Sequence, residues 1–480
     1  MASVDAERDW ELRPHPDGRV ATASPAAGQE SDTWEPPSQR SIWLPLLLAL
    51  SWMLGTFAVF WLSELDEQVQ NGTQLCVFVF GATALFALGY TVHMWHCPPA
   101  RFRRVTPTRY TTVRKLLVVA AGYHVVASAA ALATLGATGP TGIWSNVRDP
   151  ADAYLHKLDA YAQGAGQGNG ILTLLALFGV CGTMLAPLLV VYWRRLSWPI
   201  RAFGLLGLAF HVTYYLFVGT LKGLGDVSVM LGAGLLVVAV TTRRRMGRRR
   251  GRLLALGATI VVAFTVYMVF SQAARSTVFG TSDMVKANPA VVDVTGPHVA
   301  HGIAAVLFYP THGYLGLAHN LQVPFEWSNG LGNAPAATLL AEQQLGVDAS
   351  DNPSYPERTE NATGWPAQLY WATIYPWLAS DLTFPGAALF MGLVGWFFAR
   401  VWSEAFVARR VLPLLIFAQL WILIAYLPAN NQLGMSPESV TGMITLLALY
   451  LCRPRRRTPE HLGPAPRRPS AGTDPRPAAT

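Results

Sequence analysis

Residues 41–62 read SIWLPLLLALSWMLGTFAVFWL, a run of 22 residues that contains no charged side chain. An α-helix rises about 1.5 Å per residue, so about 20 apolar residues cross a hydrocarbon layer of about 30 Å. The 40 residues before this run contain no apolar stretch of the kind found in a cleavable signal peptide. We therefore expect residues 41–62 to form the first transmembrane helix and to direct membrane insertion.

Runs of this kind recur along the chain of 480 residues, of which 52% are hydrophobic and only 13% are charged. Such a composition is typical of a polytopic membrane protein rather than of a soluble domain. The expected fold class is an all-α polytopic membrane protein with about ten transmembrane helices and one long outer loop. The expected spans are 42–62, 73–95, 115–136, 171–193, 202–220, 226–242, 253–271, 383–401, 411–428 and 437–452.

The Lys and Arg residues are distributed unevenly between the two sides of this topology. With both termini in the cytoplasm, 30 of the 36 lie on the cytoplasmic side, which is the positive-inside pattern. The basic run RRRMGRRR (243–250) is then a topological anchor, and we expect no binding of nucleic acid. The chain divides into a disordered cytoplasmic tail at 1–41, a membrane domain at 42–452 and a disordered basic cytoplasmic tail at 453–480.

The outer loop 272–382 is more than 100 residues long, and a loop of that length in a compact protein is usually functional. Its two apolar segments, 298–320 and 365–380, are interrupted by Pro and carry polar groups that lipid would not tolerate unpaired. We expect both to be re-entrant or interfacial helices, and the first to stop or kink at Pro310. The alternative is that both segments cross the membrane and add two spans.

Six cations remain on the outer side, where positive-inside sorting disfavours them. We single out Arg275, Lys222 and Arg358 as candidates to bind phosphate, because a guanidinium group matches phosphate oxygens bidentately and stabilises a leaving pyrophosphate. The alternative is that these charges pair with acids of the same loops on a solvated surface. The cations that we interpret as ordinary loop charges are Arg148, Lys157 and Lys286.

Four of the 11 histidines, among them His301 and His312, fall within residues 298–319. No acidic residue lies between 294 and 325 and no zinc-site spacing is present, so we expect neither a metal nor another cofactor. The histidines either bond to the backbone at an interface, or serve as a general base or phosphate contact. His312 is favoured as the base, because the flanking Pro310 and Gly313 would expose it, and His301 is a candidate phosphate contact.

A second candidate for the base is Asp381, at the outer mouth of the expected span 383–401. A carboxylate there would accept the proton that an attacking hydroxyl group loses. The alternative is that Asp381 is a solvated cap of the helix N-terminus.

Three segments of the long loop and the following span together resemble a known family. They are FYPTHGYLGLAHNLQVPFEWSNGLGNA (308–334), YPER (355–358) and GWPAQLYWATIYPWLASDLTFPGAALFMGLVGW (364–396). This part of the chain is similar to the oligosaccharide repeat unit polymerases, the Wzy-type polymerases of O-antigens, capsules and exopolysaccharides. The ten-span layout with one long outer loop agrees with that resemblance.

The resemblance implies a metal-independent membrane glycosyltransferase in the bacterial plasma membrane. Such an enzyme moves a growing glycan from undecaprenyl pyrophosphate onto the next lipid-linked repeat unit, at the outer face. Arg275 and Arg358 match the arginines that would neutralise the pyrophosphate, whereas Lys222 stands where arginine is common and lacks its bidentate contact. The implied partners are the lipid-linked oligosaccharide, membrane lipids, a polysaccharide chain-length regulator and a flippase.

A mechanism then follows as a hypothesis. Aromatic side chains stack on sugar rings, the arginines stabilise the leaving pyrophosphate, and His312 or Asp381 deprotonates the acceptor hydroxyl. Two other functions remain open: an O-antigen-ligase-like glycosyltransferase, and a transporter or flippase of the lipid-linked saccharide. The aromatic residues expected to bind sugar are Tyr309, Tyr314, Trp327, Tyr355, Trp365 and Trp371.

Overall fold

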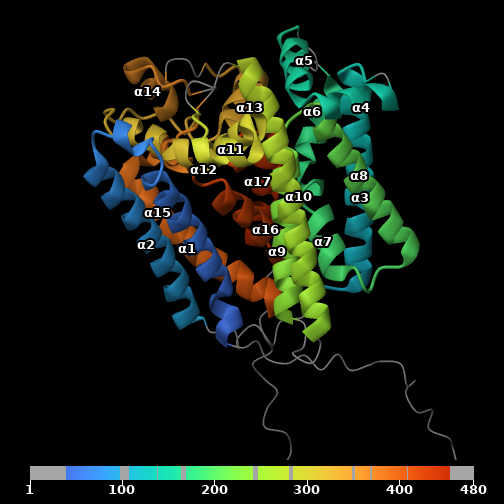
Figure 1. The fold of residues 1–480 in the computed structure, drawn as a ribbon. Helices are drawn as coiled ribbons and strands as arrows, with labels where there is room; N and C mark the ends of the chain where they lie inside the picture. The colour runs from blue at the N-terminus through green and yellow to red at the C-terminus, as the bar shows by residue number, and fades with distance from the viewer. Residues whose placement is uncertain are drawn as a thin grey trace, which may run out of the picture.

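The computed structural model describes most of the membrane domain. The tails expected at 1–41 and 453–480 lie almost wholly outside the described residues. Within the described residues the chain forms helices and connecting loops and no strand, so the all-α class is confirmed (Figure 1). The described ranges are 39–97, 108–137, 139–163, 169–241, 247–279, 285–348, 352–367, 370–407 and 409–453.

Seven described helices are long and apolar enough to cross a membrane, as expected of a polytopic membrane protein. Each coincides with an expected span, because an apolar run in lipid has to satisfy its backbone hydrogen bonds within its own helix. The seven are α1 (Gln39–Trp61), α2 (Gly72–His96), α3 (Tyr110–Thr134), α8 (Trp198–Phe217), α9 (Lys222–Thr241), α10 (Gly247–Phe279) and α15 (Ile374–Phe406).

The other three expected spans differ from simple crossings. The span expected at 171–193 is broken into α6 (Gly170–Leu177) and α7 (Leu185–Tyr192), with a bend of 60°, and counts as an eighth span only if the pair is taken together. Helices α16 (Val411–Ala425) and α17 (Pro437–Leu451) have 15 residues each, about 22 Å of helix against a hydrocarbon layer of about 30 Å. Helix α16 ends three residues before Pro428, which has no N–H group for a helical bond and whose ring would clash with the carbonyl of the preceding turn.

The α2 and α15 helices pack through backbone-to-backbone contact in the core. A Cβ atom added to Gly89 of α2 would lie 1.9 Å from the carbonyl oxygen of Gly392 in α15, and one added to Gly395 would lie 2.0 Å from that of Phe86. Small residues at such crossings allow helices in membranes to approach closely. These glycines therefore set the separation of the two helices, and a larger side chain at either position would force them apart.

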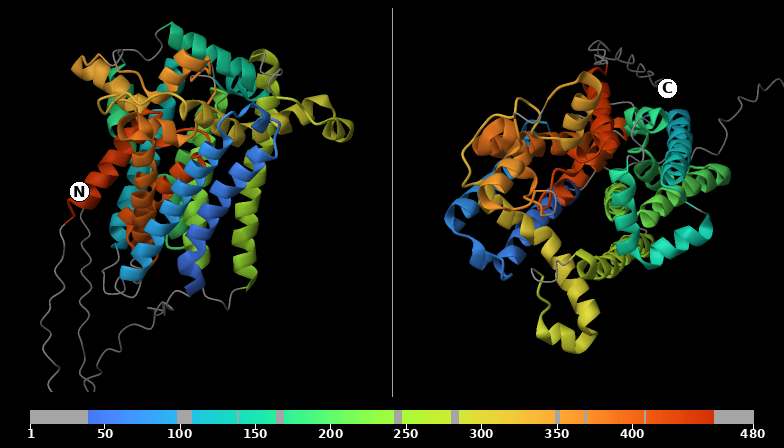
Figure 2. Two further views of the ribbon diagram at one scale, coloured as in Figure 1. Left: turned by 90° about the vertical axis from the view of Figure 1, so that its left-hand side faces the viewer. Right: turned by 90° about the horizontal axis from the view of Figure 1, so that it is seen from above.

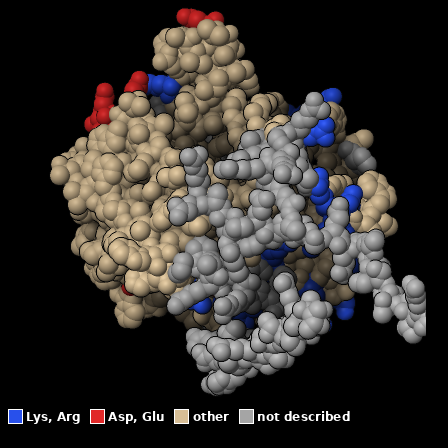
Figure 3. Space-filling view, turned by 90° about the horizontal axis from the view of Figure 1, so that it is seen from below, with Lys and Arg blue, Asp and Glu red and all other residues tan. Residues whose placement is uncertain are grey.

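The helices that connect the spans gather at one side of the bundle, which we call the loop face (Figures 1 and 2). Lys and Arg side chains gather on the opposite side, which we call the basic face (Figure 3). The long loop expected to follow α10 is thus mostly helical. The helices of the loop face are α4 (Pro140–Arg148), α5 (Pro150–Ala162), α11 (Pro289–Thr295), α12 (Pro297–Asn320), α13 (Pro335–Leu345) and α14 (Tyr355–Thr363).

Helix α12 runs through Pro310 without interruption, so the expected stop at this proline is wrong. Two side chains that follow the proline bond to carbonyl groups of the preceding turn: Thr311 Oγ1 donates to the Leu307 oxygen at 2.9 Å, and His312 Nδ1 lies 2.7 Å from the Phe308 oxygen. These bonds add to the hydrogen bonding of the turn in which proline lacks an N–H group. Helix α12 is not one of the seven candidate spans.

Helix α15 contains a sharp break at Thr383, which has a φ of 63° and starts the apolar part of the helix. The Thr383 hydroxyl accepts a hydrogen bond from the Gly386 N–H group at 3.3 Å, so threonine is the cap of this helix. Thr373, with the same φ, begins the first part of α15. A positive φ is strained for a β-branched residue, and such strain often accompanies functional segments. The two threonines bracket residues 374–382.

On the basic face, one buried carboxylate joins three helical segments. Glu404 of α15 is 3% exposed and forms a bidentate pair with Arg453, with N–O distances of 2.5 and 2.8 Å. It also accepts a hydrogen bond from Tyr450 at 2.7 Å and lies 3.5 Å from Arg410 Nη1 and 3.4 Å from Arg400 Nε. We call this group the Glu404 cluster, and it ties the end of α17 to α15.

Candidate functional site

Three cations of the loop face come together between α5, α9 and α10, and we call them the loop-face cation cluster: Lys157, Lys222 and Arg275. The Arg275 guanidinium lies over the Tyr154 ring at 4.3 Å and donates to the Gly219 carbonyl oxygen. Burial, and then the positive charges of Arg275 and Lys222, lower the pKa of Lys157 to about 8. Lys157 Nζ lies 5.3 Å from the same Tyr154 ring, so Lys157 and Arg275 share this ring, and Lys222 lies within electrostatic range of Lys157.

Few carboxylates offset this cluster within the described residues. Asp226 lies one helical turn after Lys222 and accepts a hydrogen bond from Gln432 Nε2 at 2.9 Å. The exposed Glu438 also acts on Lys222 from a distance. Arg275 is not part of any ion pair recorded for the described residues, and its Nε is buried without a hydrogen-bond partner. The Arg275 Nε therefore lacks an acceptor, and a bound anion would supply one.

Tyr309 of α12 connects this cluster with a group of aromatic side chains. Burial raises the pKa of the Tyr309 hydroxyl, and the positive charge of Arg275 opposes this rise, so the two side chains lie within electrostatic range of each other. The Tyr309 ring also meets the Trp371 ring edge to face, with 4.3 Å between the centroids. Tyr309 thus contacts Trp371, which belongs to the aromatic group, and lies within range of the positive charge of Arg275.

The aromatic group lines a pocket of about 170 Å³ on the loop face. Trp371, Tyr370 and Trp377 are its aromatic lining residues, and Glu357 also lines it. The carboxylate has a structural task, since it accepts hydrogen bonds from the N–H and hydroxyl groups of Ser354 in the capping box of α14. The other lining residues are Pro335, Pro356, Ala367, Ala372 and Met435.

His312 is buried beside this pocket, with its ring stacked on Phe308 and 5.8 Å from the Trp371 ring. Burial lowers the pKa of His312 to about 4, so the ring is neutral at pH 7. Because Nδ1 donates to the Phe308 carbonyl oxygen, the neutral ring carries its lone pair on Nε2. His312 is thus a weak proton acceptor, and the expectation that Pro310 and Gly313 expose it is wrong, because the side chain is 3% exposed.

Two glycines of α12, Gly313 and Gly316, let neighbouring stretches of backbone approach the helix closely. A Cβ atom added to Gly316 would lie 2.5 Å from the Trp371 carbonyl oxygen, and one added to Gly313 would lie 2.0 Å from that of Pro428. The two glycines are three residues apart and therefore share a helical face. Gly316 thus permits the backbone of Trp371 to contact α12 directly. The Trp371 ring then lies on the side of the helix that carries His312.

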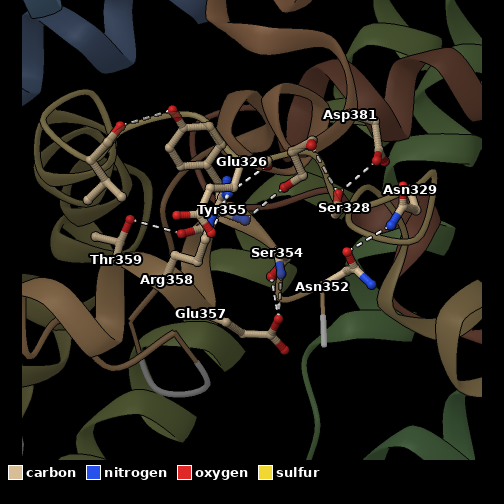
Figure 4. A network of polar contacts seen from close by, with 12 residues as sticks. Glu326, Ser328, Asn329, Asn352, Ser354, Tyr355, Glu357, Arg358, Thr359 and Asp381 are labelled. Atoms are coloured by element: carbon tan, nitrogen blue, oxygen red, sulfur yellow. Dashed lines mark hydrogen bonds and ion pairs between the residues drawn. The ribbon is translucent and has the colours of Figure 1, made fainter. Parts of the chain in front are cut away.

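Arg358 lies in a different part of the loop face, on α14, and does not belong to the cation cluster (Figures 1 and 4). The side chain is 8% exposed, donates to the Glu326 carbonyl oxygen at 2.6 Å and lies over the Tyr355 ring at 4.4 Å. The Glu326 carboxylate is 3.7 Å away and largely solvent-exposed. Nε and Nη2 of Arg358 are buried with no hydrogen-bond partner among the described residues. Two donors are therefore open to a bidentate anion.

Asp381 anchors the neighbouring loop (Figure 4). One carboxylate oxygen accepts from the Ser328 hydroxyl and from the Gly330 N–H group, both at 2.7 Å, and the other accepts from Asn333 Nδ2 at 3.0 Å. Neither oxygen lacks a donor, and Thr383 rather than Asp381 caps the helix. The geometry argues against both interpretations made from the sequence, a base and a helix cap.

The remaining predicted residues lie in unlike surroundings. Tyr314 is fully buried against α1, with its hydroxyl 2.9 Å from Thr56 Oγ1, so it holds two helices together and does not line an open surface. Tyr355 is buried under Arg358, and Trp365 is buried beside His319. Trp327 is 61% exposed on the loop face, and His301 is half-buried with an unpartnered Nε2.

The structure brings part of the predicted set close together: Tyr309 and His312 lie by Trp371, and Arg275 and Lys222 lie at the neighbouring cation cluster. It adds Lys157, whose presence among six scarce cations was a usable signal. It also adds Tyr370 and Trp377, which belong to the same aromatic stretch as Trp371.

Comparisons with protein-family models, with curated proteins and with solved structures found no match to this chain. Among the described residues, no three His, Cys, Asp or Glu side chains are grouped so that they could hold a metal ion.

Proposed function

We propose that this protein is a membrane glycosyltransferase that polymerises oligosaccharide repeat units carried on a lipid pyrophosphate. The observation that carries the proposal is the position of Tyr309, which contacts Trp371 and lies within electrostatic range of Arg275. An anion site and an aromatic pocket are thereby neighbours. A substrate with a sugar attached to pyrophosphate needs both, since aromatic faces bind sugar rings and cations bind phosphate.

The proposal includes a topology. The loop face lies outside the plasma membrane and the basic face lies in the cytoplasm, because the positive-inside rule assigns the Lys- and Arg-rich side to the cytoplasm. Ten apolar segments, with the pair α6 and α7 as one crossing and α16 and α17 as short crossings, put both termini in the cytoplasm. Helix α12 and the described residues of 365–380 (365–367 and 370–380) then lie at the outer interface as re-entrant or interfacial segments.

The proposed reaction is a displacement at the anomeric carbon of the donor sugar. The acceptor hydroxyl oxygen forms a bond to that carbon, and the bond from the carbon to the pyrophosphate oxygen breaks. The lipid pyrophosphate leaves with the bonding electron pair, and Arg275 and Lys222 stabilise its charge. The hydroxyl proton passes to His312 Nε2.

The low basicity of His312 decides whether proton transfer or stabilisation of the leaving group contributes more to the rate enhancement. A group with a pKa of about 4 accepts the proton only when the attacking oxygen has already lost most of its basicity, late in bond formation. Most of the rate enhancement therefore has to come from the cations, for which the loss of one contact typically costs about 100-fold to 1,000-fold in rate. Arg358 would contact the phosphate of a second lipid-linked unit through Nε and Nη2.

The test is chain extension by the purified protein in lipid–detergent micelles, with lipid-linked repeat units and no nucleotide. Polymers of increasing length are expected for the wild type and for Lys286→Ala, an exposed cation of the loop face. Strongly reduced extension is expected for Arg275→Ala. If a folded wild-type protein produces no extension under any substrate condition, the proposal is wrong.

An O-antigen-ligase-like enzyme would share the same geometry, and gene deletion separates the two activities. Loss of a polymerase leaves single repeat units on the lipid, whereas loss of a ligase leaves full-length lipid-linked chains.

A transporter is favoured by a separate observation, the broken pair α6 and α7, since discontinuous helices often line transport sites. Next to the break, His124 Nε2 lies 3.3 Å from the Gly182 oxygen, and its Nδ1 lies 3.1 Å from that of His211. Movement of the lipid-linked saccharide across protein-containing vesicles, without any chain extension, would support this second function over the first.

A further inference from the structure

The pocket of about 170 Å³ on the loop face is lined by aromatic and apolar residues and by one acid. The aromatic residues are Tyr370, Trp371 and Trp377, the acid is Glu357, and no Lys or Arg belongs to the described residues that line the pocket. Aromatic rings attract cations, because the quadrupole of a ring is negative over its face. An acid beside three such rings favours a positively charged ligand group and disfavours an anion.

No cation of the described residues occupies these rings or pairs with this acid. The Lys and Arg side chains that lie over aromatic rings do so at other rings, and Glu357 belongs to none of the ion pairs within the described part of the chain. The adjacent Arg358 donates to the Glu326 carbonyl oxygen and lies over Tyr355 instead. A ligand would therefore supply the positive charge that the pocket favours.

One oxygen of the Glu357 carboxylate takes part in the helix cap of α14. Oε2 accepts from the N–H and hydroxyl groups of Ser354 at 2.7 and 2.8 Å, whereas Oε1 accepts no hydrogen bond from the described residues. A capping box forms with glutamine at this position as well as with glutamate. The cap therefore needs a hydrogen-bond acceptor but not a negative charge, and Oε1 stays available for a ligand.

A second carboxylate of α14 belongs to the surroundings of the pocket. Glu360 follows Glu357 by three residues, which places both on one side of the helix. Glu360 Oε2 accepts a hydrogen bond from the N–H group of Ala367, a residue that lines the pocket, at 3.2 Å. The His312 ring lies 6.1 Å from the Tyr370 ring and is neutral at pH 7, so it does not oppose the negative charge of the two acids.

Two of the aromatic rings are held by other aromatic side chains. The Trp371 ring meets the Tyr309 ring edge to face, with 4.3 Å between the centroids, and the Tyr370 ring lies 5.2 Å from the Trp365 ring. Side chains that are already ordered lose little conformational entropy when a ligand binds. The rings are therefore available to a small charged group without further ordering.

We infer that this pocket binds a protonated primary amine, and that Glu357 selects for it. A primary ammonium group carries three N–H donors and needs an acceptor, which Glu357 Oε1 supplies, whereas a quaternary ammonium group has no N–H to donate. The rings of Tyr370, Trp371 and Trp377 attract the same positive charge. The preference for a cation rests on the residues of the pocket alone.

The molecule that carries the amine rests on the proposed function. If the pocket receives a sugar of the lipid-linked repeat unit, that sugar is an amino sugar with a free amine. Such a substrate is positive at the sugar and negative at the pyrophosphate. The two charges then match two places on the loop face, the acid-containing pocket and Arg275, which lies within electrostatic range of Tyr309.

The experiment measures binding of glucosamine, N-acetylglucosamine and glucose to the purified full chain in detergent micelles by calorimetry, at a pH at which glucosamine is protonated. Glucosamine should bind at least about tenfold more tightly than the two neutral sugars, because it alone offers a cation. Glu357→Gln keeps the capping box and should remove this preference. Glu342→Gln, a substitution of an exposed acid on α13, is the matched control and should keep the preference.

A second variant tests the pocket if Glu357→Gln lowers the unfolding midpoint. Trp377→Phe keeps an aromatic ring that attracts a cation less strongly than tryptophan does, so binding of glucosamine should become about threefold weaker. Ethanolamine carries the same amine without a sugar, and phosphatidylethanolamine carries it on a lipid headgroup. Weaker binding of ethanolamine than of glucosamine, and no competition by phosphatidylethanolamine in mixed micelles, would support a sugar as the carrier.

Several results would overturn the inference. Equal affinities for the three sugars, or a preference for glucosamine that survives in Glu357→Gln, would remove the amine or Glu357 from the site. Equally tight binding of choline would assign the pocket to a quaternary ammonium group, and strong competition by phosphatidylethanolamine would make it a headgroup site. These measurements are independent of chain extension, so a protein that prefers glucosamine but extends no chain would retain the pocket assignment and lose the proposed function. Chain extension by a protein without this preference would retain the proposed function and lose the inference.

Discussion

The Glu404 cluster and the loop-face cation cluster both gather three cations near the ends of helices, but their balance of charge differs. On the basic face, the Glu404 carboxylate accepts from Arg453 and Tyr450 and lies close to Arg400 and Arg410. On the loop face, Lys157 and Arg275 lie on the same Tyr154 ring, and Asp226, one turn after Lys222, accepts a hydrogen bond from Gln432.

This comparison distinguishes charged residues that stabilise the fold from charged residues that can bind a ligand. In the Glu404 cluster each oxygen has a donor and the guanidinium groups converge on one anion, so the group is complete without a ligand. In the loop-face cluster burial, and then the charges of Arg275 and Lys222, lower the pKa of Lys157, and the Arg275 Nε is buried without a partner. Substitutions in the first cluster should therefore affect stability, and those in the second should affect activity.

The largest effect is expected for Glu404→Gln. Removing the charge leaves three neighbouring guanidinium groups without their common partner, and breaking a buried ion pair in this way costs about 3–5 kcal/mol. Thermal unfolding in detergent should show a much lower midpoint, with Glu342→Gln, an exposed acid on α13, as the unchanged control. A midpoint equal to that of the wild type would mean that the cluster is not structural.

Arg275→Ala should reduce the activity strongly and the stability only slightly. We expect a decrease of about 100-fold or more in the rate of chain extension, because a cation at the leaving group is lost. The loss of stability should be about 1 kcal/mol, the typical contribution of the bond to Gly219. A large decrease in the unfolding midpoint together with a proportionate loss of activity would place Arg275 with the structural charges.

Arg358→Lys tests whether the second guanidinium acts through its open donors. Lysine keeps the charge but cannot offer Nε and Nη2 in a planar pair, so we expect about tenfold weaker activity. Arg148→Lys, an exposed substitution on the same face, is the control. If both Arg358→Ala and Arg358→Lys make polymer of unchanged chain length at normal expression, the electrostatic role of Arg358 is wrong.

The smallest effect is expected for Asp381→Asn. The amide can still accept from Ser328 and Gly330, and it loses only the bond with Asn333, about 1 kcal/mol of stability. Chain extension and its pH profile should stay close to those of the wild type, measured beside Asp293→Asn on the exposed surface. Abolished extension at an unchanged unfolding midpoint would instead assign the role of base to Asp381.

Much of the helical framework could be predicted because its signal is local. A charge-free run such as residues 41–62 has to satisfy its own backbone hydrogen bonds in lipid, so hydropathy alone identifies α1. The same reasoning failed at Pro310, where bonds from Thr311 and His312 accompany a helix that continues through the proline. Hydropathy also failed to predict the break in the span expected at 171–193, since an apolar run does not reveal where a helix bends.

The candidate site was predictable only in part, because its members come from distant segments. The scarcity of cations on the outer side indicated Arg275 and Lys222. Lys157 belongs to the same six cations, but it was interpreted as an ordinary loop charge. Aromatic content indicated Trp371, whereas Tyr314 has the same composition signal and lies in the core against α1. Composition shows that a stretch is rich in aromatics and does not show which rings face a pocket.

The sequence by itself determined the membrane-spanning helices and the side of the bundle on which most positive charge lies, since both depend on the transfer of individual segments between water and lipid. Only the tertiary structure decided that Lys157 joins Arg275 around Tyr154, that Asp381 is an anchor and that Tyr309 connects the cations with Trp371. Those outcomes depend on packing between segments more than 50 residues apart, and no local pattern of residues encodes them.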